Sequence, residues 1–397
     1  MKIGIDARPL QGETQYRGIG KALEFLLGAL VKQTSPSDEF VYYIDRGLPV
    51  PNLLAKLGQH RVIEVQTSRL GRTRYVRSVL PSYKPIKPRP RDIDVFLQYD
   101  TSLGVPTTVP TLTMFHDLIP LLFHSQEKRS SAKGTRRVKN ALASRLYWNK
   151  YLRTLNNYKR AEVVAAISES SKADLLKHIK GVKPAKVIVI PLGTNQNNTP
   201  ATGSKKIKKL AAKPYILYVG GIDLRKNIVE LLKTFYALKP SNPKLRLICV
   251  GKEFNLDDQM SDLGWFEIYH SRPEYSDDVL IPGFLSNDEV LYLYQHARTF
   301  VFPSRYEGFG MPVIEAMQSG CPVVAYSNSS IPEVAGKAAL LAQDNESLAP
   351  LVQKLLSSPS LRNKLIAKGK EQAKLYSWDR TATLTLKALR KAAKQNA

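Results

Sequence analysis

Two successive alternations of short apolar runs with helical patterns constrain the fold of this 397-residue chain more than any other feature. In the first half the apolar runs occupy residues 2–6, 40–44, 95–97, 111–115, 163–167 and 187–190, and a helical pattern at 22–31 follows the first of them. Runs of this kind are typical of parallel strands that are buried on both faces. The chain is therefore predicted to be an α/β protein with doubly wound parallel sheets.

A polar stretch at residues 195–213 separates the two alternations and is typical of a linker. Beyond it the pattern predicts strands at 215–219, 245–250, 299–302 and 322–325, and helices at 227–238, 287–295 and 312–317. The length fits two domains, which we place at 1–194 and 214–375. A last helix at 376–397 can pack back on the N-terminal domain. Tandem α/β domains imply a ligand cleft between them, because open parallel sheets bind beyond the carboxyl ends of their strands.

Composition excludes several classes of protein. Only two cysteines, Cys249 and Cys321, are present, which is too few for a disulfide framework or a Cys-based zinc site. A polar N-terminus argues against a signal peptide, and no apolar run is long enough for a membrane-spanning helix. A cytoplasmic protein is therefore expected, with any membrane association peripheral.

The net charge of +25 is concentrated in two basic clusters. Residues 61–91 carry nine Lys and Arg against the single acid Glu64, and residues 128–160 carry eleven and no acid. The second cluster, Lys128–Arg160, also contains apolar and aromatic residues, so a helix there could lie on the anionic inner face of the cytoplasmic membrane. The alternative is a solvated helix that packs on its own domain. Nucleic acid is not expected, because no nucleic-acid motif accompanies the charge.

The most informative stretch is 302–317, with the sequence FPSRYEGFGMPVIEAM. A strand is predicted to end near Phe302 and a helix to begin near Pro312, with a glycine-containing loop between them. Gly308 and Gly310 allow backbone N–H groups to approach a ligand closely, and the helix N-terminus favours an anionic group. This pattern predicts a site for an anion such as a phosphate.

Two carboxylates flank that site. Glu307 lies in the loop and Glu315 in the helix, so they would address different parts of one elongated ligand. Carboxylates accept hydrogen bonds from hydroxyls, and a ligand with hydroxyls at both ends and phosphate between them is a nucleotide sugar. Alone, such a pair would more simply be two surface glutamates on a capped helix.

The stretch 302–317, continuing through Gly320–Ala325 and Ser329–Val334, resembles the retaining glycosyltransferases of family 4, which have the GT-B fold. The resemblance covers nearly the whole chain. It includes Gly4–Arg8 with Gly18–Gly20, Phe115–Leu118, Ser168 with Ser171, Gly220–Gly221 leading to Arg225–Asn227, and Gly283–Phe284. It implies two Rossmann-like domains that face each other across a cleft, with the donor bound mainly by the C-terminal domain.

The resemblance also implies roles for single residues on the donor side. Glu307 would contact the hydroxyls of the donor sugar, and Glu315 the ribose of the nucleotide. The donor would further lie along Gly308, Phe309, Gly310 and Met311. Arg225 and Lys226 would neutralise the departing diphosphate, so that neither a metal ion nor another cofactor is expected. Many relatives carry an additional Arg or Lys where this chain has Gly221.

On the N-terminal side, the resemblance places His116 beside the transferred sugar and Asp117 towards the acceptor. Gly18, Ile19 and Gly20 would form a loop that closes over the diphosphate. Members of the family retain the anomeric configuration, which favours a same-face displacement in which the leaving diphosphate helps to deprotonate the acceptor hydroxyl.

The resemblance thus implies a hexosyltransferase that acts on a saccharide or lipid-linked acceptor in cell-envelope polysaccharide synthesis. GDP-mannose is the first choice of donor, and a UDP-sugar is the alternative. A nucleotide-sugar epimerase or a glycosyl phosphorylase of the same fold is the enzymatic alternative. A dinucleotide-dependent oxidoreductase is disfavoured, because residues 17–20 lack the third glycine of that fingerprint. A basic lipid- or nucleic-acid-binding protein would explain the charge but not the pair of glutamates.

Overall fold

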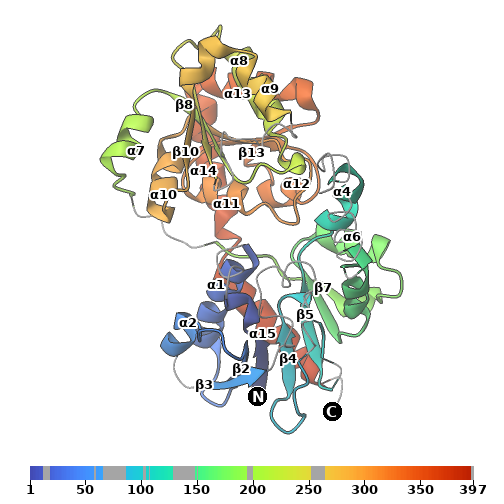
Figure 1. Ribbon diagram of the computed structural model, residues 1–397. Helices are drawn as coiled ribbons and strands as arrows, with labels where there is room; N and C mark the ends of the chain where they lie inside the picture. The colour runs from blue at the N-terminus through green and yellow to red at the C-terminus, as the bar shows by residue number, and fades with distance from the viewer. Residues whose placement is uncertain are drawn as a thin grey trace. The chain divides into compact units, whose positions relative to one another are not determined.

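The computed structural model describes residues 1–11, 18–57, 60–65, 86–101, 104–106, 108–127, 148–149, 151–194, 200–251 and 264–394. Two compact units are formed (Figure 1). The first unit consists of Met1–Leu118, Ser131–Gly193 and Trp378–Ala397, and the second of Ile119–Ser130 and Thr194–Ser377. Within the described residues, none of the helices is both long enough and apolar enough to cross a bilayer.

A parallel seven-stranded sheet forms the centre of the first unit. Its strands are β1 (Lys2–Asp6), β2 (Glu39–Asp45), β3 (His60–Val65), β4 (Val95–Gln98), β5 (Thr111–Phe115), β6 (Val163–Ala166) and β7 (Val187–Val189). They are ordered β3-β2-β1-β4-β5-β6-β7. From β1 the chain adds strands on one side of the sheet, and from β4 it adds them on the other, so the strand order reverses between β1 and β4. Open α/β sheets bind ligands at the carboxyl ends of the strands at such a point.

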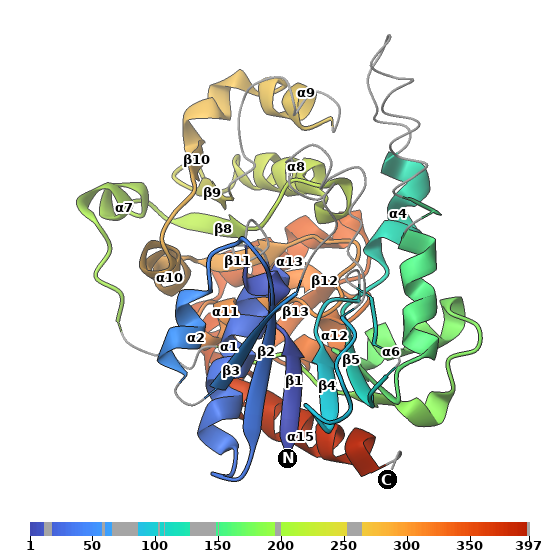
Figure 2. The same ribbon diagram turned by 60° about the horizontal axis from the view of Figure 1, so that its bottom comes forward.

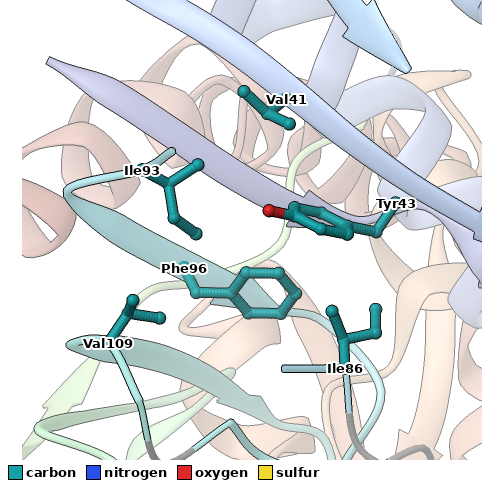
Figure 3. Close-up of a cluster of buried hydrophobic side chains, with 6 residues drawn as sticks. All are labelled: Val41, Tyr43, Ile86, Ile93, Phe96 and Val109. Carbon is teal, nitrogen blue, oxygen red and sulfur yellow. The ribbon is translucent and has the colours of Figure 1, made fainter. Parts of the chain in front are cut away.

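Helices cover both faces of this sheet. They include α1 (Gly18–Gln33), α2 (Asn52–Lys56), α6 (Glu169–His178) and the C-terminal α15 (Trp378–Lys394). Helix α15, which crosses the lower end of the sheet in Figure 2, packs on α1 and on β4 and β5. Apolar side chains fill the interior, and one buried cluster, drawn in Figure 3, joins Val41, Tyr43, Ile86, Ile93, Phe96 and Val109.

The second unit is built on a parallel six-stranded sheet. Its strands are β8 (Tyr215–Val219), β9 (Arg246–Val250), β10 (Val279–Gly283), β11 (Thr299–Phe302), β12 (Val323–Tyr326) and β13 (Ala339–Ala342), ordered β10-β9-β8-β11-β12-β13. Its helices are α4 (Ile119–Glu127), α7 (Lys205–Leu210), α8 (Ile228–Leu238), α9 (Trp265–His270), α10 (Asn287–His296), α11 (Met311–Gln318), α12 (Ile331–Ala335), α13 (Asn345–Ser357) and α14 (Pro359–Lys374). The order reverses between β8 and β11.

The predicted α/β class with doubly wound parallel sheets is confirmed. One local prediction is wrong: Gly18, Ile19 and Gly20 form the first turn of α1 and not a loop. Burial of the apolar face of α1 outweighs the poor helix propensity of glycine. The stretch 195–213, expected as a linker, contains α7, whose Ile207 is buried and whose Ser204 side chain caps the helix. Most of the basic cluster Lys128–Arg160 lies outside the described residues.

Candidate active site

The candidate site lies in the second unit, where β8 and β11 end side by side. These strands are neighbours in the sheet, so their carboxyl ends meet at the same edge. The segment after β8 forms a short 3-10 turn, Leu224–Lys226, that presents two cations. Asn227 ends the turn in the left-handed conformation, with φ 56°, and α8 begins directly after it. The segment after β11 carries Glu307.

The carboxylate of Glu307 binds both cations. Its Oε1 accepts hydrogen bonds from Arg225 Nη1 at 2.7 Å, from Lys226 Nζ at 2.6 Å and from Ser304 Oγ at 2.6 Å. For Oε2 no hydrogen bond is found within the described residues. One carboxylate oxygen is therefore saturated by three donors, while the other remains available to hydroxyl groups of a ligand.

The loop around Glu307 is fixed through its backbone as well. The N–H of Glu307 donates to Ser329 Oγ, and its carbonyl accepts from Ser330 Oγ, each at 2.9 Å. The N–H of Arg305 donates to the carbonyl of Arg225 at 2.7 Å and so joins the two loops directly. Glu307 is 8% exposed. Such a preorganised arrangement costs little to order when a substrate binds.

At Gly310, in the loop between β11 and α11, the backbone passes close to Ile331. Gly310 has φ 99°, and a Cβ built on it would lie 2.6 Å from Ile331 Cδ1. Helix α11 begins directly afterwards at Met311, with proline in its first turn. Phe309 packs edge-on against Tyr376, with ring centroids 5.5 Å apart. The residues expected along the sugar and diphosphate thus surround the N-terminus of α11, where anions are favoured.

Glu315 lies in the second turn of α11, on the same helix that follows the glycine motif. Burial raises the pKa of its carboxyl group to about 7. No hydrogen-bond partner is found for the carboxyl group in the part of the chain that the structure describes. A half-buried carboxyl that lacks a partner costs free energy in its charged form, which is typical of functional positions.

Two side chains of the second unit were given no individual role in the sequence analysis. Phe284 follows β10 and is 77% exposed, which is unusual for a large aromatic side chain. Asp223 lies 3.1 Å from Arg225 Nε and forms a second ion pair with this arginine. The acidic side chain at the start of the 3-10 turn could have indicated this pair, whereas nothing local predicts that Phe284 is exposed.

The candidates His116 and Asp117 lie in the first unit, directly after β5. His116 Nε2 is 3.1 Å from the carbonyl oxygen of Tyr99. Because a carbonyl can only accept, Nε2 carries the proton, and in the neutral ring Nδ1 is then an acceptor for a hydroxyl. Ser171 Oγ donates to the His116 carbonyl at 2.9 Å, which fixes the backbone. Asp117 follows and is half-buried.

A buried ion pair in the first unit was not foreseen. Asp6, at the end of β1, accepts from Arg8 Nε at 2.7 Å and from Gln98 Nε2 at 2.7 Å. Asp6 and Gln98 are fully buried, and Arg8 is 4% exposed. These residues lie at the carboxyl ends of β1 and β4, where the order of the first sheet reverses. They fix the backbone at the edge of the sheet where ligands bind in such folds.

Comparison with known proteins decides the family of the second unit. Residues 202–372 match the family described as "Glycosyl transferases group 1". This segment is a group 1 glycosyltransferase domain. It contains Arg225, Lys226, Glu307 and Glu315, and the match confirms the prediction of a glycosyltransferase domain for these residues. The assignment to family 4 is compatible with the match and stays a prediction.

Relatives extend the match. The chain is 31% identical over 244 residues to the O-antigen chain mannosyltransferase B of Escherichia coli, which covers 57% of this chain and 60% of that protein. Sucrose-phosphate synthase from Thermosynechococcus elongatus superposes with a TM-score of 0.67 at 20% identity, covering 98% of both chains. HepE of Anabaena, solved with UDP and glucose, gives a TM-score of 0.68 at 15% identity over 98% of this chain and 99% of that one. These similarities confirm the predicted GT-B fold with two Rossmann-like domains.

Proposed function

We propose that the protein is a retaining glycosyltransferase that moves a hexose from a nucleotide-diphosphate sugar to a saccharide or lipid-linked acceptor in cell-envelope glycan synthesis. The observation that carries the proposal is the Glu307 carboxylate, which is held at Oε1 by Arg225, Lys226 and Ser304. Oε2 of the same group would accept hydrogen bonds from the donor sugar. This arrangement lies where the strand order reverses, at the edge where α/β sheets bind their ligands.

The donor proposed first is GDP-mannose, and a UDP-sugar is the alternative. Mannose is supported by the name of the Escherichia coli relative, and a uridine nucleotide by the UDP bound to HepE. The exposed ring of Phe284 offers a stacking surface for either base. Glu315 would accept from the ribose hydroxyls, and the backbone at the N-terminus of α11 would bind the diphosphate.

The chemical step proposed here needs no metal ion. Arg225 and Lys226 would stabilise the charge that develops on the leaving diphosphate, because arginine has five N–H donors and lysine three. In the first domain, Nδ1 of His116 would accept from a sugar hydroxyl, and Asp117 would lie towards the acceptor. Transfer would take place at the inner face of the cytoplasmic membrane, where a lipid-linked acceptor is presented.

The test is a product assay with GDP-mannose and with UDP-sugars, each with and without a metal chelator, on the wild type and on Glu307→Gln. Glutamine keeps the volume of the buried Glu307 side chain but removes its charge. We therefore expect kcat to fall about 100-fold or more. Glu371→Gln, which removes an exposed carboxylate from α14, is the matched control and should leave transfer unchanged.

Activity of Glu307→Gln close to that of the wild type would refute the assignment. Formation of an epimerised nucleotide sugar, without transfer to an acceptor, would favour the epimerase. Release of sugar 1-phosphate from the saccharide, when inorganic phosphate is supplied in place of the nucleotide sugar, would favour the phosphorylase. The anomeric configuration of the product tests retention directly.

A further inference from the structure

A groove of about 860 Å³ lies in the first unit between β7 and α15. Strand β7 is the last strand of its sheet and pairs with β6. Helix α15 packs on α1, β4 and β5, and one flank of the helix faces residues 188–190 across the groove. The floor is apolar and consists of Ile188, Val189, Ile190, Leu384 and Ala388.

The rim of this groove carries charge of one sign. All the charged side chains that line it are basic, namely Lys387, Arg390, Lys391 and Lys394. Arg390 lies 3.6 Å from Asp38 and is partly neutralised by it. The three lysines are exposed and form no ion pair within the described residues. Their spacing of four and three residues places them along one side of α15.

We propose that this α15 groove is a docking surface for an anionic phospholipid membrane. The combination of an apolar floor with a cationic rim matches the two parts of such a lipid, because headgroup phosphates pair with lysines and acyl segments cover the apolar floor. None of the residues that line the groove belongs to the candidate active site, so the transfer chemistry explains neither the apolar floor nor the cationic rim.

Other occupants fit the groove less well. A second copy of this chain would bring the same lysines face to face, and like charges repel. A nucleic-acid backbone would neutralise the lysines but leave the apolar floor in water. The basic cluster Lys128–Arg160 is a separate candidate membrane contact, and the experiment must distinguish it from the α15 groove.

The experiment measures binding of the full-length chain to sedimented vesicles, either pure phosphatidylcholine or an equimolar mixture with phosphatidylglycerol. The test variant is Lys387→Gln/Lys391→Gln/Lys394→Gln. The control variant, Lys205→Gln/Lys208→Gln/Lys209→Gln, removes the same charge from exposed positions of α7 in the second unit. Circular dichroism and thermal unfolding establish that both variants are folded.

Each lysine close to an anionic surface strengthens partitioning by about fivefold, so the α15 variant should bind mixed vesicles about 100-fold more weakly than the wild type. The α7 variant should bind almost as well as the wild type, and raised salt should weaken wild-type binding. A further variant, Leu384→Gln, should also bind more weakly, because it makes the floor polar.

Three outcomes would overturn the proposal. The first is a wild type that does not bind mixed vesicles. The second is an α15 variant that binds as the wild type does, which would assign any binding to another part of the chain, such as Lys128–Arg160. The third is an equal loss in the α7 control, which would show that only the net charge matters. Because the readout is binding and not transfer, none of these results bears on the proposed glycosyltransferase activity.

Discussion

The charged form of Glu315 should lower the free energy of unfolding above neutral pH. Replacing this residue should therefore raise stability and, at the same time, weaken nucleotide binding. The carboxyl group lies in α11, and burial raises its pKa from 4.5 to about 7. Glu315→Gln preserves the shape of the side chain and removes its titration. Because the same residue is proposed to bind the ribose, the variant should gain stability and lose affinity.

The sign and size of the effect follow from the pKa. The folded state holds this proton more tightly than the unfolded chain, so its contribution is complete below about pH 4.5 and is lost as the pH rises through 7. A shift of this size corresponds to about 3.5 kcal/mol at about 1.4 kcal/mol per pKa unit. Glu315 is only half-buried, and solvent screening reduces the expected figure to about 2 kcal/mol.

The assay is thermal unfolding of the wild type and of Glu315→Gln at pH 5 and at pH 8, with and without GDP or UDP. At pH 5 the two proteins should unfold at nearly the same temperature. At pH 8 the variant should unfold about 4–8 °C higher, which corresponds to about 2 kcal/mol for a unit of this size. Nucleotide should raise the midpoint of the wild type more than that of the variant.

A variant that is no more stable than the wild type at pH 8 would refute the argument from burial. Equal stabilisation of both proteins by nucleotide would refute the contact with ribose and leave the argument from burial intact. Glu371→Gln again serves as the control, because its exposed carboxylate should leave the pH dependence unchanged.

Two further substitutions test the geometry around Glu307. Ser304→Ala removes one of the three donors to Oε1 and should lower kcat about tenfold in an activity assay, since a hydrogen bond to a charged group contributes about 1.5–3 kcal/mol. The control Thr299→Val, which removes a buried hydroxyl from β11, should have nearly normal activity. Equal losses in the two variants would contradict a positioning role for Ser304. Gly310→Ala should lower the free energy of unfolding by about 2 kcal/mol, because φ is 99° and Ile331 Cδ1 would lie 2.6 Å from the added Cβ. An unchanged denaturation midpoint would show that the loop accommodates the added Cβ without loss of stability.

The central buried strands were predictable from sequence, whereas some of the partly exposed edge strands were not. The run at 111–115 predicted β5 to the residue, because a central parallel strand is apolar at nearly every position. Strand β10 was missed, since Val279–Gly283 contains a proline, lies at the edge of its sheet and is mostly half-buried. Strand β13 is the opposite edge of the same sheet and has only four residues. These two edge strands lack the pattern on which such a prediction depends, whereas edge strand β7 (Val187–Val189) has it and was predicted.

For the candidate site, the sequence predicted which residues matter but not how they meet. Glu307, Arg225 and Lys226 were each assigned to the donor, yet their mutual ion pair was not foreseen. The pair joins residues 81 and 82 positions apart, and only the adjacency of β8 and β11 brings them together. Strand order is a property of the whole sheet, so no local pattern reveals it.

The charges at the site balance locally, although the chain as a whole carries +25. Arg225 and Lys226 face Asp223 and Glu307, which gives two cations and two carboxylates within a few ångströms. A diphosphate there would therefore gain little from the general field of the protein and more from directed N–H donors. Removing Glu307 leaves two largely buried cations without their shared carboxylate, whereas Asp223 is about half exposed and its loss should cost less. Their substitutions should consequently fail to add, because the four side chains act as one unit and not as separate contacts.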